Sequence, residues 1–211
     1  MKPAFRDRAA AGAHLAAMLE KYKGGNAVVL AIPAGGVPVG AAIARELGLP
    51  VHAAPVSKVL YPWTTESGFG AVAFDGSVWI DEEAAENSRL TKAQVEKAVA
   101  DARAKVERRT KTLSSGKALT GLSGKTVILV DDGIAAGSTM RTAIAALRKL
   151  GAGRIVVAVP TAPSRSLDVM RRFADEIVCP NIRGGGSFAV ADAYEEWRDL
   201  SDDEVEAMLK R

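Results

Sequence analysis

Cysteine and histidine are scarce in this chain. Its 211 residues include one cysteine, Cys179, and two histidines, His14 and His52. A single cysteine excludes an intramolecular disulfide and any multi-cysteine zinc pattern, and two histidines cannot build a histidine-rich metal site. Because Cys179 ends the apolar run 176–179, we interpret it as a buried structural thiol rather than a reactive one.

Long apolar segments and blocks of like charge are missing as well. No segment approaches the roughly 18 apolar residues of a transmembrane helix, and the charged N-terminal residues do not resemble a signal peptide. We therefore expect a cytoplasmic protein with no membrane partner. The net charge of +3 argues against nucleic acid as a partner. A solvated helix face explains the basic residues in 105–111 better than a phosphate-binding patch does.

Helical and apolar patterns alternate along the chain. With 48% hydrophobic and 25% charged residues, the composition is that of a globular protein, and the length suits one domain spanning 1–211. Continuous apolar runs are typical of strands buried on both faces of a parallel sheet. The sequence therefore predicts an α/β fold whose mostly parallel central sheet is flanked by helices. Helices are expected at 7–23, 37–47, 138–150 and 164–173, and strands at 27–32, 51–56, 126–130, 154–159 and 176–179.

The middle of the chain differs in character. Residues 57–70 show neither the helical nor the strand spacing of apolar residues. They are predicted to form a long loop, and long loops in compact domains often carry function. Asp75-Gly76 between two apolar runs predicts a β-hairpin, and Thr91 with Gln94 predicts a capping box that begins a helix to about Leu113. One stripe of that helix is expected to pack on a sheet or on a second subunit of a homodimer; it contains Val95, Val99, Ala102 and Val106.

One segment carries recognisable chemistry. Residues 127–140 combine a buried strand, the adjacent Asp131 and Asp132, a loop of small residues and the start of a helix. Ligands of open α/β sheets bind at the carboxyl ends of the strands. Small residues let the backbone approach a ligand, and a helix start offers unpaired N–H groups, which together suit a phosphate monoester. The loop residues concerned are Gly133, Ala135, Ala136, Gly137, Ser138 and Thr139.

Two other phosphate-binding patterns do not fit this segment. A Walker A loop has a lysine after its second glycine, whereas Ser138 follows Gly137, and a dinucleotide fingerprint needs a different glycine spacing. The acidic pair would repel an anion unless it met a sugar diol or a metal ion. A ribose 5-phosphate offers two vicinal hydroxyls near its phosphate. Two solvated aspartates at a strand end are the simpler alternative.

The segment resembles the 5-phosphoribosyl-1-diphosphate-binding signature of type I phosphoribosyltransferases. That signature has an apolar strand, two acidic residues and a small-residue loop ending in Gly-Ser/Thr-Thr. The resemblance implies that Asp131 and Asp132 hold the ribose hydroxyls and bind Mg²⁺, and that 135–139 surround the 5-phosphate. The implied reaction, as in nucleotide salvage, displaces pyrophosphate from the anomeric carbon with a nitrogen of a nucleobase-like acceptor, mainly through positioning and electrostatics.

A glycine-rich turn supports the resemblance. Ala34, Gly35, Gly36 and Val37 follow the first apolar strand, in a place similar to the family's pyrophosphate loop. The two glycines are expected to adopt conformations closed to other residues and so to expose N–H groups to an anion. An ordinary strand-to-helix turn is the alternative. The segments at 5–8, 35–38 and 69–73 also resemble predicted phosphoribosyltransferases of bacteria and archaea, so the likeness covers nearly the whole chain.

Two charged residues receive roles from the resemblance alone. Lys58 would neutralise part of the diphosphate, although a surface lysine is an equal alternative. Residues 60–70 correspond to the family's mobile catalytic loop, whose closure would exclude water. Glu66 in this loop would contact the acceptor or the metal ion, and a solvated carboxylate is its alternative.

The acceptor side is less defined. The resemblance implies a small hood at 180–198, with or without the N-terminal helix, in which Phe188 would stack on a base. Tyr194 and Trp197 are expected to pack the C-terminal helix onto the core. Members specific for 6-oxopurines carry an aspartate where this chain has Ala135, which argues against such an acceptor.

Two other classes of function stay open. A non-catalytic regulator of the same fold would sense 5-phosphoribosyl-1-diphosphate and could bind nucleic acid through a basic face, with steep salt dependence. A hydrolase or phosphorylase of another phosphorylated sugar would leave the diphosphate turn idle. The intact loop, the glycine turn and the low net charge favour the enzyme.

Overall fold

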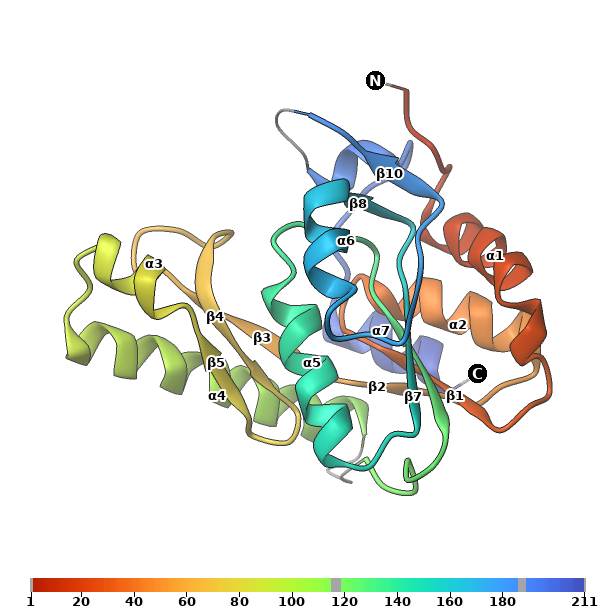
Figure 1. Cartoon of the computed structure of the whole chain (residues 1–211), viewed down its shortest axis with the longest axis horizontal. Coiled ribbons are helices and arrows are strands. Elements are labelled where there is room, and N and C mark those ends of the chain that lie inside the picture. Colours follow the sequence, from red (N-terminus) through yellow and green to blue (C-terminus); the bar gives the residue numbers. More distant parts are fainter. Residues whose placement is uncertain (1, 115–118, 186–188, 211) are drawn as a thin grey trace.

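The fold is built on a five-stranded sheet in which every pair of neighbouring strands is parallel. A computed structural model describes residues 2–114, 119–185 and 189–210. The strand order is β2-β1-β6-β7-β9 (Figure 1). The strands are β1 (Ala27–Ala31), β2 (Val51–Ala53), β6 (Thr126–Val130), β7 (Arg154–Ala158) and β9 (Glu176–Val178). The predicted α/β fold with a parallel central sheet is confirmed.

Each face of this sheet is covered by helices. Alternate side chains of a strand point to opposite faces, so Val28 and Leu30 pack on one side and Val29 on the other. The side of Val29 is covered by α1 (Arg8–Met18) and α2 (Gly36–Leu47). The other side is covered by α5 (Ser138–Lys149) and α6 (Ser164–Met170). Burial on both faces explains why β1 is entirely apolar and why β6 and β7 are apolar after their first residue.

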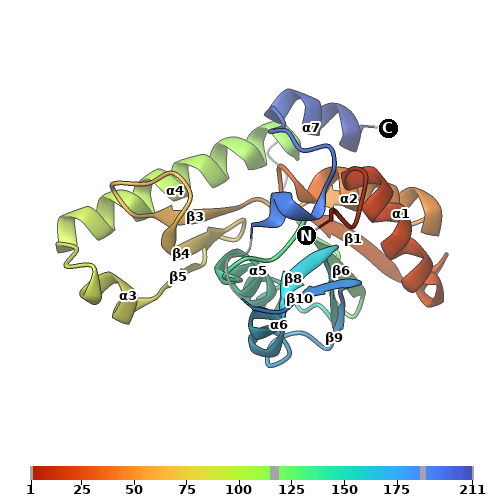
Figure 2. The same ribbon diagram turned by 90° about the horizontal axis from the view of Figure 1, so that it is seen from above.

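A second, antiparallel sheet projects from the parallel one. It consists of β3 (Val56–Leu60), β4 (Gly68–Ala73) and β5 (Val78–Ile80), and lies at the left of Figure 1 with α3 (Glu82–Asn87) and α4 (Lys92–Leu113). Figure 2 shows α4 running along this sheet toward α7 (Asp202–Leu209). The predicted hairpin and the Thr91 capping box are confirmed. The apolar stripe of α4 packs on the antiparallel sheet, as expected.

The prediction for residues 51–70 was wrong in two respects. The expected strand 51–56 is interrupted at Pro55, which cannot donate to a strand ladder, and the chain passes from β2 in one sheet to β3 in another. Much of the expected loop 57–70 is strand, since β3 pairs with β4. Only residues 61–67 connect the two strands.

The C-terminal part holds more regular structure than predicted. β8 (Thr161–Pro163) and β10 (Asn181–Arg183) form a parallel pair, so 180–198 is not wholly irregular. The short helix η2 (Val190–Ala193) follows, and the Phe5 backbone forms a bridge with Tyr194. The N-terminal segment thus lies beside residues 193–196, through hydrogen bonds between the two backbones.

A surface network joins the short helix η1 (Glu20–Tyr22) to the edge strand β9. The Glu176 carboxylate accepts hydrogen bonds from Tyr22 at 2.8 Å and from Arg154 at 3.0 Å, and pairs with Lys21 at 2.7 Å. Burial raises the pKa of Glu176, but hydrogen bonds from Lys21, Tyr22 and Arg154 outweigh it and hold that pKa at about 2. Among the residues that the structure describes, no helix has the length and apolar character to span a membrane.

Candidate functional site

The two aspartates lie at the carboxyl end of β6, between the ends of β1 and β7. The backbone N–H of Asp132 donates to Asp131 Oδ1 at 2.9 Å, which turns the Asp131 carboxylate back toward the loop. Burial raises the pKa of Asp131 well above its ordinary value, and the neighbouring charge of Asp132 adds to the increase. A partly buried pair of carboxylates favours a cation or hydroxyl donors as its partner.

Asp132 has a cationic partner that the sequence did not predict. Arg8 Nε donates to Asp132 Oδ2 at 2.8 Å, and the two side chains are 10% and 15% exposed. Burial raises the pKa of Asp132, while the Arg8 charge opposes that increase. The phenol of Tyr194 donates to the Asp132 carbonyl at 2.6 Å. Arg8 ends the Phe-Arg-Asp-Arg segment at 5–8. Because it lies 124 residues from Asp132 in the sequence, no local pattern could predict their contact.

The loop after the acidic pair presents a row of free N–H groups. In the described part of the chain, no acceptor lies within hydrogen-bond distance of the backbone N–H groups of residues 135–139. Those of Ser138 and Thr139 belong to the first turn of α5, where no intrahelical acceptor exists. The helix dipole adds partial positive charge at the same place. This cradle suits a phosphate group.

Three contacts fix the shape of this cradle. Ile134 is buried, and its N–H donates to Thr161 O at 3.0 Å. Ser166 Oγ donates to Ala135 O at 2.5 Å, which turns that carbonyl away from the cradle. Gly137 has a φ of +87°, a conformation that other residues adopt only with strain. The loop is therefore held in one conformation before any ligand binds.

The glycine turn at 34–37 packs directly against the acidic pair. A Cβ on Gly35 would lie 1.8 Å from Asp132 Oδ2, and one on Gly36 would lie 2.8 Å from Val130 O. The predicted reason for the two glycines was wrong, since Gly35 has an ordinary helical φ of −62° and Gly36 has no positive φ. Glycine is needed here because the turn and the aspartates approach too closely for a side chain.

Part of this turn is available to a ligand. Gly36 N–H donates to Ile32 O and Val37 N–H to Ala34 O, so both are used within the turn. The N–H groups of Ala34 and Gly35 have no acceptor among the described residues. From outside, Arg109 Nη1 donates to Pro33 O at 2.9 Å, and its Nε pairs with Asp202 of α7. Arg109, predicted to be solvated, instead braces the turn.

Lys58 lies on β3, outside the parallel sheet. It is exposed, and its Nζ donates to Glu66 O at 3.1 Å. Its charge lowers the pKa of Asp131, but less than burial and the neighbouring Asp132 raise it. The Glu66 carboxylate makes no hydrogen bond or ion pair with a described residue. Among the described residues, neither the Lys58 nor the Glu66 side chain contacts the acidic pair.

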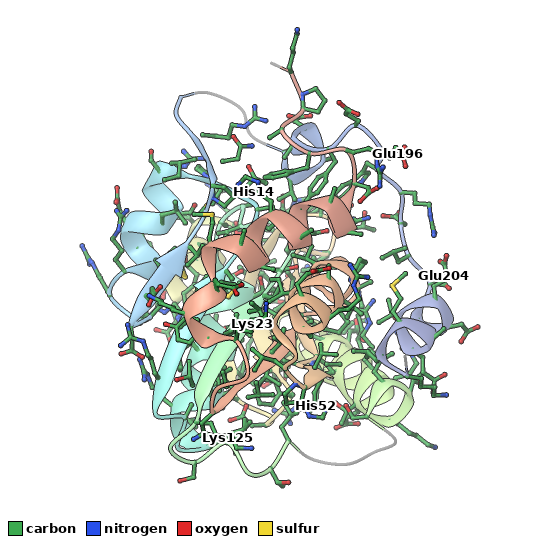
Figure 3. All side chains as sticks on the ribbon, turned by 90° about the vertical axis from the view of Figure 1, so that its right-hand side faces the viewer. His14, Lys23, His52, Lys125, Glu196 and Glu204 are labelled. Carbon is green, nitrogen blue, oxygen red and sulfur yellow. The ribbon has the colours of Figure 1, made fainter. Side chains whose placement is uncertain are left out.

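The donor set for a metal ion is limited to the acidic pair. In the described ranges, no three His, Cys, Asp or Glu side chains gather in a way that could hold a metal ion. Figure 3 shows His14 and His52 at separate places on the molecule. Two adjacent, partly buried carboxylates fit an oxygen-seeking cation such as Mg²⁺, which commonly takes only one or two protein carboxylates beside phosphate oxygens and water.

The predicted hood is described only in part. Phe188 lies outside the described residues. Val190 of η2 packs on Gly133, since a Cβ there would lie 2.6 Å from Val190 Cγ1. The expected role of Tyr194 and Trp197 was wrong: both rings lie near the Arg8 guanidinium, at 6.0 Å and 3.8 Å, rather than under α7. The buried face of α7 is instead formed by Val205 and its neighbours.

The thiol of Cys179 is not an activated nucleophile. It is partly buried, and its Sγ lies 3.8 Å from Asn181 O. Burial raises the pKa of Cys179 to about 11, so the thiol form prevails at neutral pH. This agrees with the interpretation of Cys179 as structural.

An acidic pair and an N–H cradle thus lie side by side at one strand end of an α/β sheet, an arrangement that suits a phosphate group next to hydroxyl groups. Residues 5–192 match the family described as "Phosphoribosyl transferase domain". The chain belongs to this family, because the match covers most of its length. The predicted family is thereby confirmed.

Individual relatives resemble the chain over its whole length. Two proteins of Mycobacterium tuberculosis, "Putative phosphoribosyl transferase Rv0571c" and "Putative phosphoribosyl transferase MT0597", are each 35% identical over 213 residues. The match covers 98% of this chain but 46% of theirs, so the chain spans about half the length of these curated relatives. The crystal structure of TT1426 from Thermus thermophilus is 32% identical with a TM-score of 0.78, and the match covers 99% of this chain and 98% of that one.

Proposed function

We propose that the chain transfers the 5-phosphoribosyl group from 5-phosphoribosyl-1-diphosphate to a nitrogen of a nucleobase-like acceptor. In this reaction the bond from the anomeric carbon to the diphosphate oxygen breaks, and pyrophosphate leaves with the electron pair. A bond from the same carbon to the acceptor nitrogen forms, and that nitrogen loses a proton. The cationic character of the sugar in the transition state makes positioning and electrostatics the main contributions of the protein.

The observation that carries the proposal is the N–H cradle at 135–139 directly after two partly buried aspartates. The cradle has the geometry and partial charge for the 5-phosphate. Asp131 and Asp132 are adjacent to it, and their carboxylates would accept hydrogen bonds from the ribose hydroxyls. A phosphate site and a diol site in this order match the two ends of a ribose 5-phosphate.

The diphosphate would lie on the other side of the acidic pair. Ala34 and Gly35 offer two N–H groups there without an acceptor among the described residues, and Lys58 would add a positive charge. Asp131 and Asp132 would also hold Mg²⁺, which would lower the negative charge on the leaving group. Glu66, on the loop beside Lys58, would contact the acceptor or the metal ion after loop closure.

The acceptor would approach from the hood at 180–198. Val190 and Tyr194 already border the acidic pair through Gly133 and the Asp132 carbonyl. Phe188 would supply a stacking surface. Ala135 lacks the carboxylate that members specific for 6-oxopurines use, so acceptors other than hypoxanthine, guanine or xanthine should be screened first.

The test is a calorimetric titration of the chain with 5-phosphoribosyl-1-diphosphate and magnesium, followed by assays of pyrophosphate release with a panel of nucleobases and amines. We expect micromolar binding that Asp131→Asn weakens strongly, because an amide is a poorer acceptor for hydroxyls and a poorer partner for a cation. Asp168→Asn is the matched control, since its side chain is 66% exposed on α6 and, among the described residues, pairs only with Arg171.

The outcomes separate the classes of function. Binding with pyrophosphate release supports the transferase. Binding without release by any acceptor favours a regulator that senses the donor. Equal affinity for ribose 5-phosphate and the full donor would favour an enzyme acting on another phosphorylated sugar. No binding of the donor by the folded chain would refute the proposal.

A further inference from the structure

The two aspartates of the acidic pair have different surroundings. Asp131 accepts from a backbone N–H and makes no ion pair in the described part of the chain. The Asp132 carboxylate is held from two sides. Arg8 Nε binds Oδ2 at 2.8 Å, and the Gly35 backbone lies so close that a Cβ would overlap the same oxygen.

Arg8 is itself held by residues near the C-terminus. Its Nη1 donates to Arg198 O at 2.8 Å, and its Cζ lies 3.8 Å from the centroid of the Trp197 ring. Arg8 is 9% exposed, so its guanidinium is largely removed from water. A buried arginine with both a hydrogen-bond acceptor and a stacking partner has little freedom to leave its position.

We propose that Arg8 is a positioning residue of the donor site: it fixes the Asp132 carboxylate against the glycine turn and connects it to Trp197 and Arg198. This inference rests on the proposed function and adds to it a residue from outside the signature. Arg8 does not need to touch the donor, because it uses one oxygen of Asp132 and acts through that carboxylate.

The consequence is that donor affinity depends on residues far from the phosphate loop. Loss of a group that orients a ligand-binding side chain commonly weakens binding about 10- to 100-fold. We therefore expect Arg8→Met to weaken the binding of magnesium and 5-phosphoribosyl-1-diphosphate to that extent. Arg8→Lys keeps the charge but not the planar fork, and should retain part of the affinity.

The control is Arg6→Met, in the same N-terminal segment. The Arg6 side chain is 67% exposed, and Asp7 is its one ion-pair partner in the part of the chain that the structure describes, so this variant should bind the donor as the wild type does. A double variant tests the path of the effect. If Arg8 acts through Asp132, Arg8→Met/Asp132→Asn should bind no more weakly than Asp132→Asn alone. Losses that multiply in the double variant would indicate a general structural role and overturn the proposal.

Thermal unfolding would first establish that each variant is folded. If Arg8→Met does not fold, the donor affinities of Arg8→Lys and Trp197→Ala test the proposal instead. Trp197 stacks on Arg8 and is 39% exposed. Weakened binding by both variants supports the proposal, and wild-type affinity in both overturns it. Failure of the wild type to bind the donor would refute the proposed function together with this inference. If the wild type binds the donor tightly and the Arg8 variants bind it equally well, the inference alone is refuted.

Discussion

Replacement of Gly35 by alanine should damage both stability and donor binding. The new methyl carbon would lie 1.8 Å from Asp132 Oδ2 and 2.5 Å from Asp132 Cγ. The φ of Gly35 is −62°, so alanine meets no backbone strain and the effect is purely steric. A free aspartate could rotate away from the methyl group. Asp132 cannot do so easily, because it is paired with Arg8.

The size of the effect follows from the two ways of making room. Breaking the buried pair between Asp132 and Arg8 would cost about 3–5 kcal/mol. Shifting the glycine turn as an overpacked segment would cost about 1–3 kcal/mol. The smaller of these two costs should set the effect. We therefore expect Gly35→Ala to lose about 1–3 kcal/mol of unfolding free energy, or roughly 2–12 °C in Tm. A shift of the turn also moves the N–H groups offered to the diphosphate, and donor affinity should fall about tenfold or more.

The assay combines thermal unfolding with calorimetric titration of the donor and magnesium. Gly184→Ala is the matched control for stability and donor binding, because a Cβ at Gly184 would meet no atom of a described residue within 4 Å and its φ is not positive. The control should stay within about 0.5 kcal/mol of the wild type. If Gly35→Ala were as stable as Gly184→Ala and bound the donor equally well, the close approach of turn and acidic pair would not exist as described.

Other expectations concern the loop, a surface network and the single thiol. Gly137→Ala places a side chain at a φ of +87° and should lower the unfolding free energy by about 1–2 kcal/mol in urea denaturation, whereas an unchanged midpoint would argue against that conformation. Ser166→Ala leaves the Ala135 carbonyl without its donor and should cost about 1–3 kcal/mol by the same measurement, with weaker donor binding; equal stability would mean that water replaces the hydroxyl. Glu176 has a pKa of about 2 in the folded chain and 4.5 as its ordinary value, so its stabilisation is complete above pH 4.5 and is lost as the pH falls toward 2. The Tm of Glu176→Gln should therefore depend less on pH between 5 and 3 than that of the wild type, and parallel curves would contradict this. At pH 8 only about a thousandth of the Cys179 thiol should be ionised, so disulfide reagents should react slowly in the folded chain and rapidly after unfolding; fast labelling of the folded chain would show that burial does not control the thiol.

The parallel sheet could be predicted because its strands are buried on both faces. β1, β6 and β7 are continuous apolar runs, and the helices between them carry clear boundaries such as Gly48, which ends α2 with a φ of +63°. β3 carried no such signal. It includes Ser57 and Lys58, and it becomes a strand only by pairing with β4 across residues 61–67. Non-local pairing of this kind cannot be deduced from a short window of sequence.

The candidate site likewise has parts that the sequence predicts and parts that it does not. The N–H cradle at 135–139 lies within one continuous segment, so the sequence alone predicts its small residues and the helix start after them. The glycine turn was placed correctly, but for the wrong reason. A Gly-Gly pair in a sequence suggests unusual backbone angles, whereas here it reflects the distance to Asp132, which depends on how β1 and β6 pair.

The contacts of Asp132 explain why a local motif does not describe the whole site. Its carboxylate touches the glycine turn and Arg8, and its carbonyl accepts from Tyr194. These partners come from α1, from the turn before α2 and from the segment after η2. Under the proposed function, the segment 127–140 would determine which ligand groups can be bound. Residues from both terminal segments of the chain would determine how rigidly the Asp132 carboxylate is presented. Relatives that share the signature but differ at Arg8 or Tyr194 should accordingly differ in donor affinity, even where every residue of the loop is the same.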